Sequence, residues 1–288
     1  MSDNPNPVAA QAPPKGMARK WLFGVLALAF LFVLMPFLFW KATWFGSPLT
    51  DEELQKNLTD LEHPRKTQHA LAQIAERMMR KDPAVKQWYP QVAALAGHKV
   101  DEIRTTAAWA MGQDNSVPEF HQALLRLGAD PNALVRRNAA LALVRFNDDS
   151  GHREIVSMLQ PYVMAATHAG TLSERLKPGD VVNPGTLLGR IKSGDKEIEI
   201  RAAVPGTLER WLVIDGSAVT RAQEILSISP DSTTVWEALR GLVLVGRAED
   251  LREIEPYARG VAGMPEQVRQ QAQEAMTAIK QRSSGQSQ

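Results

Sequence analysis

The chain has 288 residues, of which 44% are hydrophobic and 23% are charged, and this is typical of a mostly globular protein of about two domains. Its 33 Lys and Arg residues balance 32 Asp and Glu residues to a net charge of +1, so we expect no nucleic-acid partner, which would require a basic excess. The absence of cysteine excludes disulfides, thiolate metal sites and a cysteine nucleophile.

Residues 21–40 form a strongly apolar stretch that contains no charged side chain. At about 1.5 Å per residue they reach the roughly 30 Å of a bilayer core, and Trp21 and Trp40 flank them as interfacial aromatics do. A cleaved signal peptide is the alternative, but its apolar core is only about 7–15 residues long and small residues follow it. We therefore predict a retained transmembrane helix over 19–42.

The charges on the two sides of this stretch differ in sign. Lys15, Arg19 and Lys20 precede it, and Asp51, Glu52 and Glu53 follow it. The positive-inside rule then predicts a single-pass protein of a bacterial inner (plasma) membrane, with a cytoplasmic N-terminus and residues 45–288 extracytoplasmic. The lipid bilayer is thus one expected partner. Residues 1–18, rich in Pro, Ala and Asn, are predicted to be a disordered cytoplasmic tail, and 284–288 a second disordered tail.

A short pattern then repeats along the chain. Residues 103–111 (IRTTAAWAM) and 135–143 (VRRNAALAL) align without gaps at an offset of 32 and share the form apolar-Arg-x-x-Ala-Ala-x-Ala-apolar. Residues 268–276 form a weaker copy. Such a period is typical of stacked helix pairs, because one pair cannot bury its own apolar face. We predict helix pairs over 50–160 and again over 231–283.

The string at 130–143, D-P-x-x-x-V-R-x-x-A-A-x-A-L, resembles the HEAT repeat family, in particular its short phycobilisome-lyase-like type. The resemblance implies an α-solenoid that offers a protein-binding or scaffolding surface. The lyase-like type also implies, as an alternative, a place in a chromophore-attachment complex. We interpret Arg104 and Arg136 as capping or salt-bridging residues within the stack, with ligand binding as the alternative.

Between residues 161 and 230 the helical periodicity stops and Gly and Pro become frequent. Two similar stretches start at Gly170-Thr171-Leu172 and Gly206-Thr207-Leu208, and each continues through a second Gly turn into short apolar runs. Their offset is 36 at the first Gly and 37 from the second Gly onward. Turn sequences between short apolar runs predict strands, so we expect two strand–turn–strand halves packed as a two-fold sandwich.

This frame resembles the biotinyl/lipoyl domain, a barrel-sandwich hybrid that also occurs in bacterial membrane-fusion (periplasmic adaptor) proteins. Those proteins carry a long α-hairpin between the two halves, whereas only a tight turn joins them here. Together these patterns predict an α+β multidomain chain. It comprises an N-terminal transmembrane helix, an α-solenoid of HEAT-like helix pairs, and an inserted small β barrel-sandwich hybrid.

The turn between the halves reads Ser193-Gly194-Asp195-Lys196-Glu197. In lipoyl carriers a lysine in such a turn takes the prosthetic group, so the resemblance implies Lys196 as a lipoyl or biotinyl attachment site. The hairpin is one residue longer than the lipoyl pattern, no Met-Lys-Met is present, and the predicted topology separates Lys196 from cytoplasmic ligases. We therefore expect no cofactor and keep a carrier modified on Lys196 as the alternative function.

Motifs of common catalytic and metal sites are not found in the sequence. The six histidines lack metal-ligand spacing, and no nucleophile elbow, phosphate loop or EF-hand is present. We predict no metal site, no catalytic residues and no enzymatic activity. The expected function is a membrane-anchored scaffold or adaptor, within or beside a transport or secretion complex. It would bind protein partners through its helix pairs and its β module.

Overall fold

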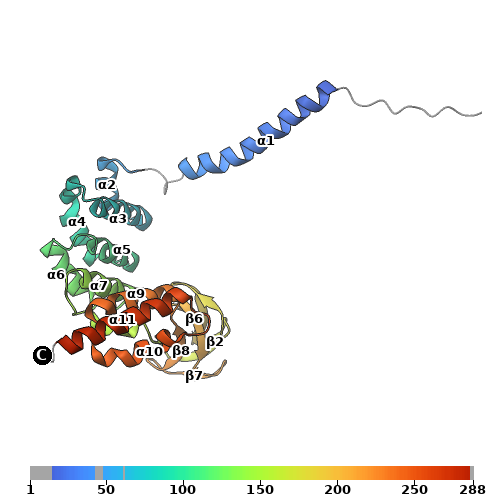
Figure 1. Cartoon of the computed structure of the whole chain (residues 1–288). Helices are drawn as coiled ribbons and strands as arrows, with labels where there is room; N and C mark the ends of the chain where they lie inside the picture. The colour runs from blue at the N-terminus through green and yellow to red at the C-terminus, as the bar shows by residue number, and fades with distance from the viewer. Residues whose placement is uncertain (1–14, 43–47, 61, 286–288) are drawn as a thin grey trace, which may run out of the picture. The chain divides into compact units, whose positions relative to one another are not determined.

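Two units make up the chain, residues 1–50 and residues 51–288 (Figure 1). The computed structural model describes residues 15–42, 48–60 and 62–285. The first unit contains helix α1 (Lys15–Ala42), with Pro36 inside it. The second unit is of the α+β class, with antiparallel sheets between helices.

Within the described residues, no helix combines the length and the apolar character needed to cross a membrane.

This finding corrects two predictions. The transmembrane helix over 19–42 was wrong, and so was the single-pass inner-membrane localisation with residues 45–288 extracytoplasmic. The lipid bilayer as a partner loses the helix on which it was based and stays a prediction. The predicted disordered tails at 1–18 and 284–288 lie mostly outside the described residues, and their described residues belong to α1 and α11 (Glu266–Gly285).

Helices of the second unit follow one another in pairs, here called the helical array (Figure 1). The pairs are α2 (Asp51–Leu58) with α3 (Pro64–Met79), α4 (Tyr89–Ala94) with α5 (Asp101–Met111), α6 (Pro118–Leu127) with α7 (Ala133–Arg145), α8 (His152–Ser157) with α9 (Ser232–Val245), and α10 (Leu251–Arg259) with α11. Short 3₁₀ turns η1 (Pro83–Trp88), η2 (Leu95–Gly97) and η3 (Ala248–Asp250) adjoin them. The second helices of successive pairs, α3, α5, α7, α9 and α11, contact one another in that order.

Local capping chemistry sets where several of these helices begin. The Asn132 side chain accepts a hydrogen bond from the backbone N–H of Leu134 at 2.8 Å and so starts α7. Asp231 caps α9 in the same way by accepting from Thr234 N–H at 2.8 Å. Pro118 begins α6, where its missing N–H has no helical partner to lose.

A ladder of hydrogen bonds links the first helices of successive pairs. Its members are Tyr89 to Asp114 (2.6 Å), His121 to Asp148 (2.6 Å) and His152 to Asp250 (2.7 Å). Each aromatic side chain contacts the Asp in the turn that precedes the first helix of the next pair. The last step spans 98 residues in sequence because the β strands lie between α8 and α9. The pair α8–α9 is therefore one repeat whose inter-helix loop holds the insertion.

The inserted strands, here called the β module, form two four-stranded antiparallel sheets in the orders β1-β8-β6-β3 and β5-β4-β2-β7. The strands are β1 (Tyr162–Ala165), β2 (Gly170–Glu174), β3 (Val181–Val182), β4 (Leu187–Ser193), β5 (Lys196–Arg201), β6 (Gly206–Trp211), β7 (Ala218–Val219) and β8 (Glu224–Ser229). Strand β2 pairs with β4 and β7, and β6 pairs with β8 and β3. The short strand of each half, β3 or β7, therefore pairs with a strand of the other half.

Hydrogen bonds repeat this two-fold relation atom by atom. Gly179 N–H donates to Leu208 O at 2.8 Å, and Gly216 N–H donates to Leu172 O at 2.9 Å. The two leucines are buried in the module core. At the first residue of both β2 and β6 a side chain would overlap a carbonyl oxygen of the neighbouring strand, which explains why glycine opens both halves.

Helix α7 contributes to two hydrophobic cores. Ala140 and Val144 belong to the core that α7 shares with α8, α9, α10 and α11. Ala133, at the start of the same helix, is buried in the core of the β module. Helix α7 therefore holds the module against the helical array.

A close contact beside α7 gives a test of this packing. A Cβ atom on Gly151 would lie 2.6 Å from the Cα atom of Ala140, which is backbone and has little room to move. We expect Gly151→Ala to lower the free energy of unfolding by about 1–3 kcal/mol through overpacking, measured by urea denaturation. Gly97→Ala is the matched control, because no atom lies within 4 Å of its added Cβ, and it should change stability by less than about 1 kcal/mol. Equal effects of the two substitutions would contradict the close approach.

Candidate binding groove

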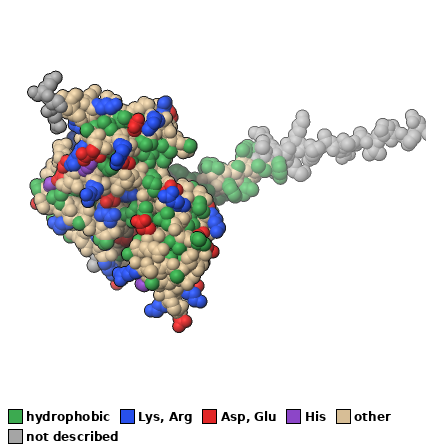
Figure 2. Space-filling model, turned by 90° about the horizontal axis from the view of Figure 1, so that it is seen from below, with side chains coloured by type: hydrophobic (Ala, Val, Ile, Leu, Met, Phe, Trp, Pro, Cys, Tyr) green, Lys and Arg blue, Asp and Glu red, His purple; other side chains and the backbone are tan. Residues whose placement is uncertain are grey.

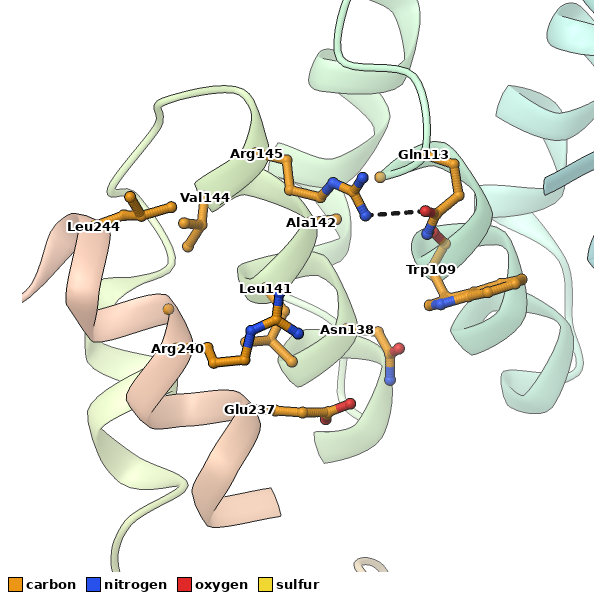
Figure 3. Close-up of a pocket in the computed structure, with 12 residues that line it drawn as sticks. Trp109, Gln113, Asn138, Leu141, Ala142, Val144, Arg145, Glu237, Arg240 and Leu244 are labelled. Carbon is orange, nitrogen blue, oxygen red and sulfur yellow. Dashed lines mark hydrogen bonds between the residues drawn. The ribbon is translucent and has the colours of Figure 1, made fainter. Parts of the chain in front are cut away.

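A groove of about 430 Å³ lies along the second helices α5, α7 and α9 of the helical array (Figure 3). We call it the main groove. It is lined by Trp109, Gly112 and Gln113 of α5 and its end, by Asn138, Leu141, Ala142, Val144 and Arg145 of α7, and by Glu237, Arg240, Gly241 and Leu244 of α9. The groove is open to solvent and follows three helices, of which α9 lies far from the other two in sequence.

Large apolar side chains stand exposed at both sides of the main groove. Trp109 of α5 is 40% exposed and Leu244 of α9 is 61% exposed. Leu141 of α7 lies between these helices (Figure 3). Exposed apolar side chains that gather in a groove, with polar groups around them, mark an interaction surface more often than scattered ones do.

Charged side chains of the main groove are only loosely engaged within the protein. The Arg145 guanidinium donates to Gln113 Oε1 at 2.9 Å, and the Arg240 guanidinium lies 4.6 Å from the ring centroid of Trp236. Glu237 extends from α9 toward α7 (Figure 3). Across the described residues, none of Arg145, Glu237 and Arg240 forms an ion pair within 4.0 Å.

The environment of Glu237 is unfavourable to its charge. Although Glu237 keeps access to solvent, desolvation by the surrounding helices raises the pKa of its carboxyl group, and repulsion from Asp231 adds to this. Attraction to Arg240 opposes the shift without cancelling it. The Glu237 carboxylate could therefore accept a hydrogen bond from a bound molecule.

This arrangement suits non-covalent recognition. Apolar contact from Trp109 and Leu244 provides area, and the two arginines provide directional donors. Among the described residues, no group of three or more His, Asp or Glu is placed to hold a metal ion. The absence of enzymatic activity and of a cofactor stays a prediction.

Arg104 and Arg136, for which the sequence left two interpretations, are engaged in the stack. Arg104 binds Asp130 through two hydrogen bonds of 2.7 and 2.9 Å and also donates to His98 O at 2.9 Å. Arg136 binds Glu154 at 3.0 Å and donates to Asp130 O at 2.9 Å. Both guanidinium groups therefore tie one turn to the next, which confirms the structural interpretation.

Lys196 lies at the tip of the hairpin that joins β4 to β5, where it pairs with Ser193. Gly194 in this turn has φ of +62°, a conformation that glycine adopts readily. The Lys196 side chain is exposed, and no ion pair is found for it within the described residues. Its modification stays a prediction.

Sequence analysis missed the main groove, although one signal was present. Trp109 and Leu141 occupy the variable position x of the repeated Ala-Ala-x-Ala pattern, and Gln113 and Arg145 follow each of them by four residues. Positions four apart share one helix face. The residues at the variable position of the two repeats, and those four positions later, therefore line the same groove.

Comparison of the chain with models of known protein families and with curated proteins finds no match. The resemblances to HEAT-repeat and biotinyl/lipoyl families accordingly stay predictions, and the case for a function depends on the geometry above.

The Arg104–Asp130 pair of the helical array predicts an acid-sensitive contribution to stability. Burial would raise the pKa of Asp130, but hydrogen bonds from Arg104 and from the Asn132 backbone outweigh it and hold the pKa below its ordinary value of 3.8. The stabilisation is therefore complete above that value and is lost as the pH falls through the lower pKa of the folded state.

We expect Asp130→Asn to lower the free energy of unfolding at neutral pH by about 1.5–3 kcal/mol, since it leaves Arg104 without a charged partner. The difference from the unmodified chain should shrink on acidification to about pH 3, as measured by urea denaturation at both pH values. Asp195→Asn, at an exposed hairpin tip, is the control and should be neutral. A difference that does not depend on pH would contradict the assigned pKa direction.

Proposed function

We propose that this chain is a non-enzymatic scaffold that binds a segment of a partner protein in the main groove of its helical array. The observation that carries the proposal is the placement of exposed Trp109 and Leu244 beside Arg145 and Arg240. Tryptophan and arginine are the residue types that most often dominate the energy of protein–protein interfaces.

The shape of the groove favours a polypeptide segment over a small molecule. Small-molecule sites enclose most of the ligand surface, whereas this groove is open and runs across three helices (Figure 3). Stacked repeats create extended surfaces of this kind, along which a linear segment can contact several repeats at once.

The scaffold would be preorganised. Helix α7 forms the floor of the groove and is packed on both sides, with Ala140, Leu143 and Val144 all buried. The hydrogen bond from Arg145 to Gln113 links α7 to the end of α5. A rigid floor reduces the entropy that binding must overcome. The β module would supply a second protein-binding surface, in keeping with its resemblance to adaptor proteins of transport and secretion complexes.

A carrier function through Lys196 is the second candidate. What favours it is the position of Lys196 at the exposed tip of the β4–β5 hairpin, because a prosthetic group attached by an amide bond to Nζ needs room to swing. The tip also lies in a module with two-fold related halves. The two functions are compatible in structure.

The scaffold function predicts that the purified chain selects peptides from a random-peptide display library through the main groove. Trp109→Ala/Leu244→Ala should weaken binding of the recovered peptides about tenfold or more, measured by fluorescence anisotropy, because hot-spot side chains are removed. Val181→Ala/Ile214→Ala is the matched control. It removes side chains that are 78% and 80% exposed but lie in the β module. Failure to recover peptides, or equal binding by both variants, would contradict the scaffold function.

The carrier function makes a different prediction about mass. Protein isolated from its native host should then be heavier than the mass calculated from the sequence, and Lys196→Arg should return it to the calculated value. Lys192→Arg, on the same hairpin and also exposed, is the control and should leave the added mass in place. An intact mass equal to the calculated one would exclude Lys196 as a carrier site.

A further inference from the structure

A second groove, of about 510 Å³, continues from the main groove on the side of η1 and α4. Its lining includes Met78, Met79, Lys81, Lys86, Tyr89 and Asp114. Gln113 and Arg145 line both grooves, so the two hollows meet at the hydrogen bond between these side chains. A ligand that crosses this point would contact residues of four successive helix pairs.

Among the described residues, the basic side chains along this path are not held in close ion pairs, although Lys86 attracts Asp114 and Arg240 attracts Glu237 over longer distances. They are Lys81 and Lys86 in the second groove, Arg145 at the junction and Arg240 in the main groove. In the part of the chain that the structure describes, none of the four forms an ion pair within 4.0 Å, whereas nearby Arg77 binds Asp51 at 2.8 Å and Arg104 binds Asp130 at 2.7 Å.

The acidic side chains along the same path are largely committed to contacts within the protein. Asp82 accepts a hydrogen bond from Ala84 N–H at 2.9 Å and caps η1. Asp114 accepts from the Tyr89 hydroxyl at 2.6 Å and from Ser116 Oγ at 2.6 Å. Glu237 is the exception, because no ion pair engages its carboxylate among the described residues. The path therefore presents four cations outside close ion pairs, while two of its three carboxylates already accept hydrogen bonds within the protein.

From this distribution of charge we infer that the two grooves together bind an acidic segment of a partner protein, with Asp or Glu side chains on the four unpaired cations and an apolar side chain against Trp109. The inference rests on the proposed function and specifies its ligand. Charge complementarity of this kind sets the choice of partner and the rate of association more than the total affinity.

A peptide is favoured over a nucleic acid as the source of negative charge. The chain as a whole has a net charge of only +1, and Figure 2 shows basic and acidic side chains interspersed over the face that it displays. Nucleic-acid binding draws on an extended basic surface that neutralises many phosphates. Four cations beside exposed apolar side chains fit a short acidic peptide with apolar residues.

The test uses the full chain and a random-peptide display library. Peptides recovered by the unmodified protein should be enriched in Asp and Glu over the starting library. Binding of a recovered acidic peptide should be about tenfold weaker in Arg145→Glu/Arg240→Glu and should weaken as salt is raised. Arg126→Glu/Arg153→Glu is the matched control, because these exposed arginines line neither groove. Circular dichroism of each variant verifies folding.

The outcomes separate this inference from the proposed function. Recovery of peptides that need Trp109 but show no acidic enrichment would overturn the inference and leave the scaffold function in place. Failure to recover any peptide that depends on the main groove would overturn both. Tighter binding of single-stranded DNA than of acidic peptides, lost in Arg145→Glu/Arg240→Glu, would show a general polyanion site and also overturn the inference. Lys86→Glu alone should weaken acidic peptides if the path extends into the second groove.

Discussion

The close approach of helix α7 to its neighbours is the contact on which the rest of the second unit depends. Gly151 lies directly over Ala140, and a Cβ atom on Gly112 would lie 2.9 Å from that of Ala142. Small side chains at these positions bring helices of adjacent repeats into backbone contact, where interiors have little free volume. With larger residues α5, α7 and α8 would move apart, and the floor of the main groove would lose its shape. The alanines of the repeated Ala-Ala-x-Ala pattern thus serve packing, and the residues at its variable position, Trp109 and Leu141, line the main groove.

The same helix attaches the β module through a buried charge. Arg137 is 4% exposed, its guanidinium lies 5.5 Å from the ring centroid of Tyr162, and its Nε is 3.9 Å from Glu154 with no hydrogen bond among the described residues. Burial lowers the pKa of Arg137, while attraction to Glu154 and Tyr162 opposes this. Tyr162 begins β1, and the charge of Asp231, which caps α9 after β8, also acts on Arg137. A buried charge adds little net stability by itself, and the contacts of Arg137 with Tyr162 and Glu154 place it between α7 and the start of β1.

Sequence patterns predicted the elements that depend on local chemistry and missed those that depend on three-dimensional assembly. The Ala-rich repeat at 103–111 and 135–143 lies in α5 and α7, and Gly-Thr-Leu opens both β2 and β6. These elements could be predicted because close packing at these positions requires alanine or glycine, and such residues are recognisable in the sequence. The main groove was not found, since its lining combines α5 and α7 with α9, which stands beyond a long insertion. The transmembrane prediction for 21–40 was based on the length of the apolar stretch, its flanking tryptophans and the charges beside it, and none of the described helices meets the requirements for a span.

The position of the insertion explains how a repeat stack can carry a second fold without losing its register. Tyr162 pairs with Ile228 in the antiparallel ladder of β1 and β8, so the two ends of the β module lie side by side. A segment whose ends are adjacent fits between α8 and α9 in place of a short loop, and the entropy of closing a loop rises only slowly with its length. The His152–Asp250 hydrogen bond across the insertion continues the ladder that Tyr89 begins. Because every buried residue of the module core except Ala133 lies within the module, the surface of the module can change while α7 and α9 keep the main groove between them.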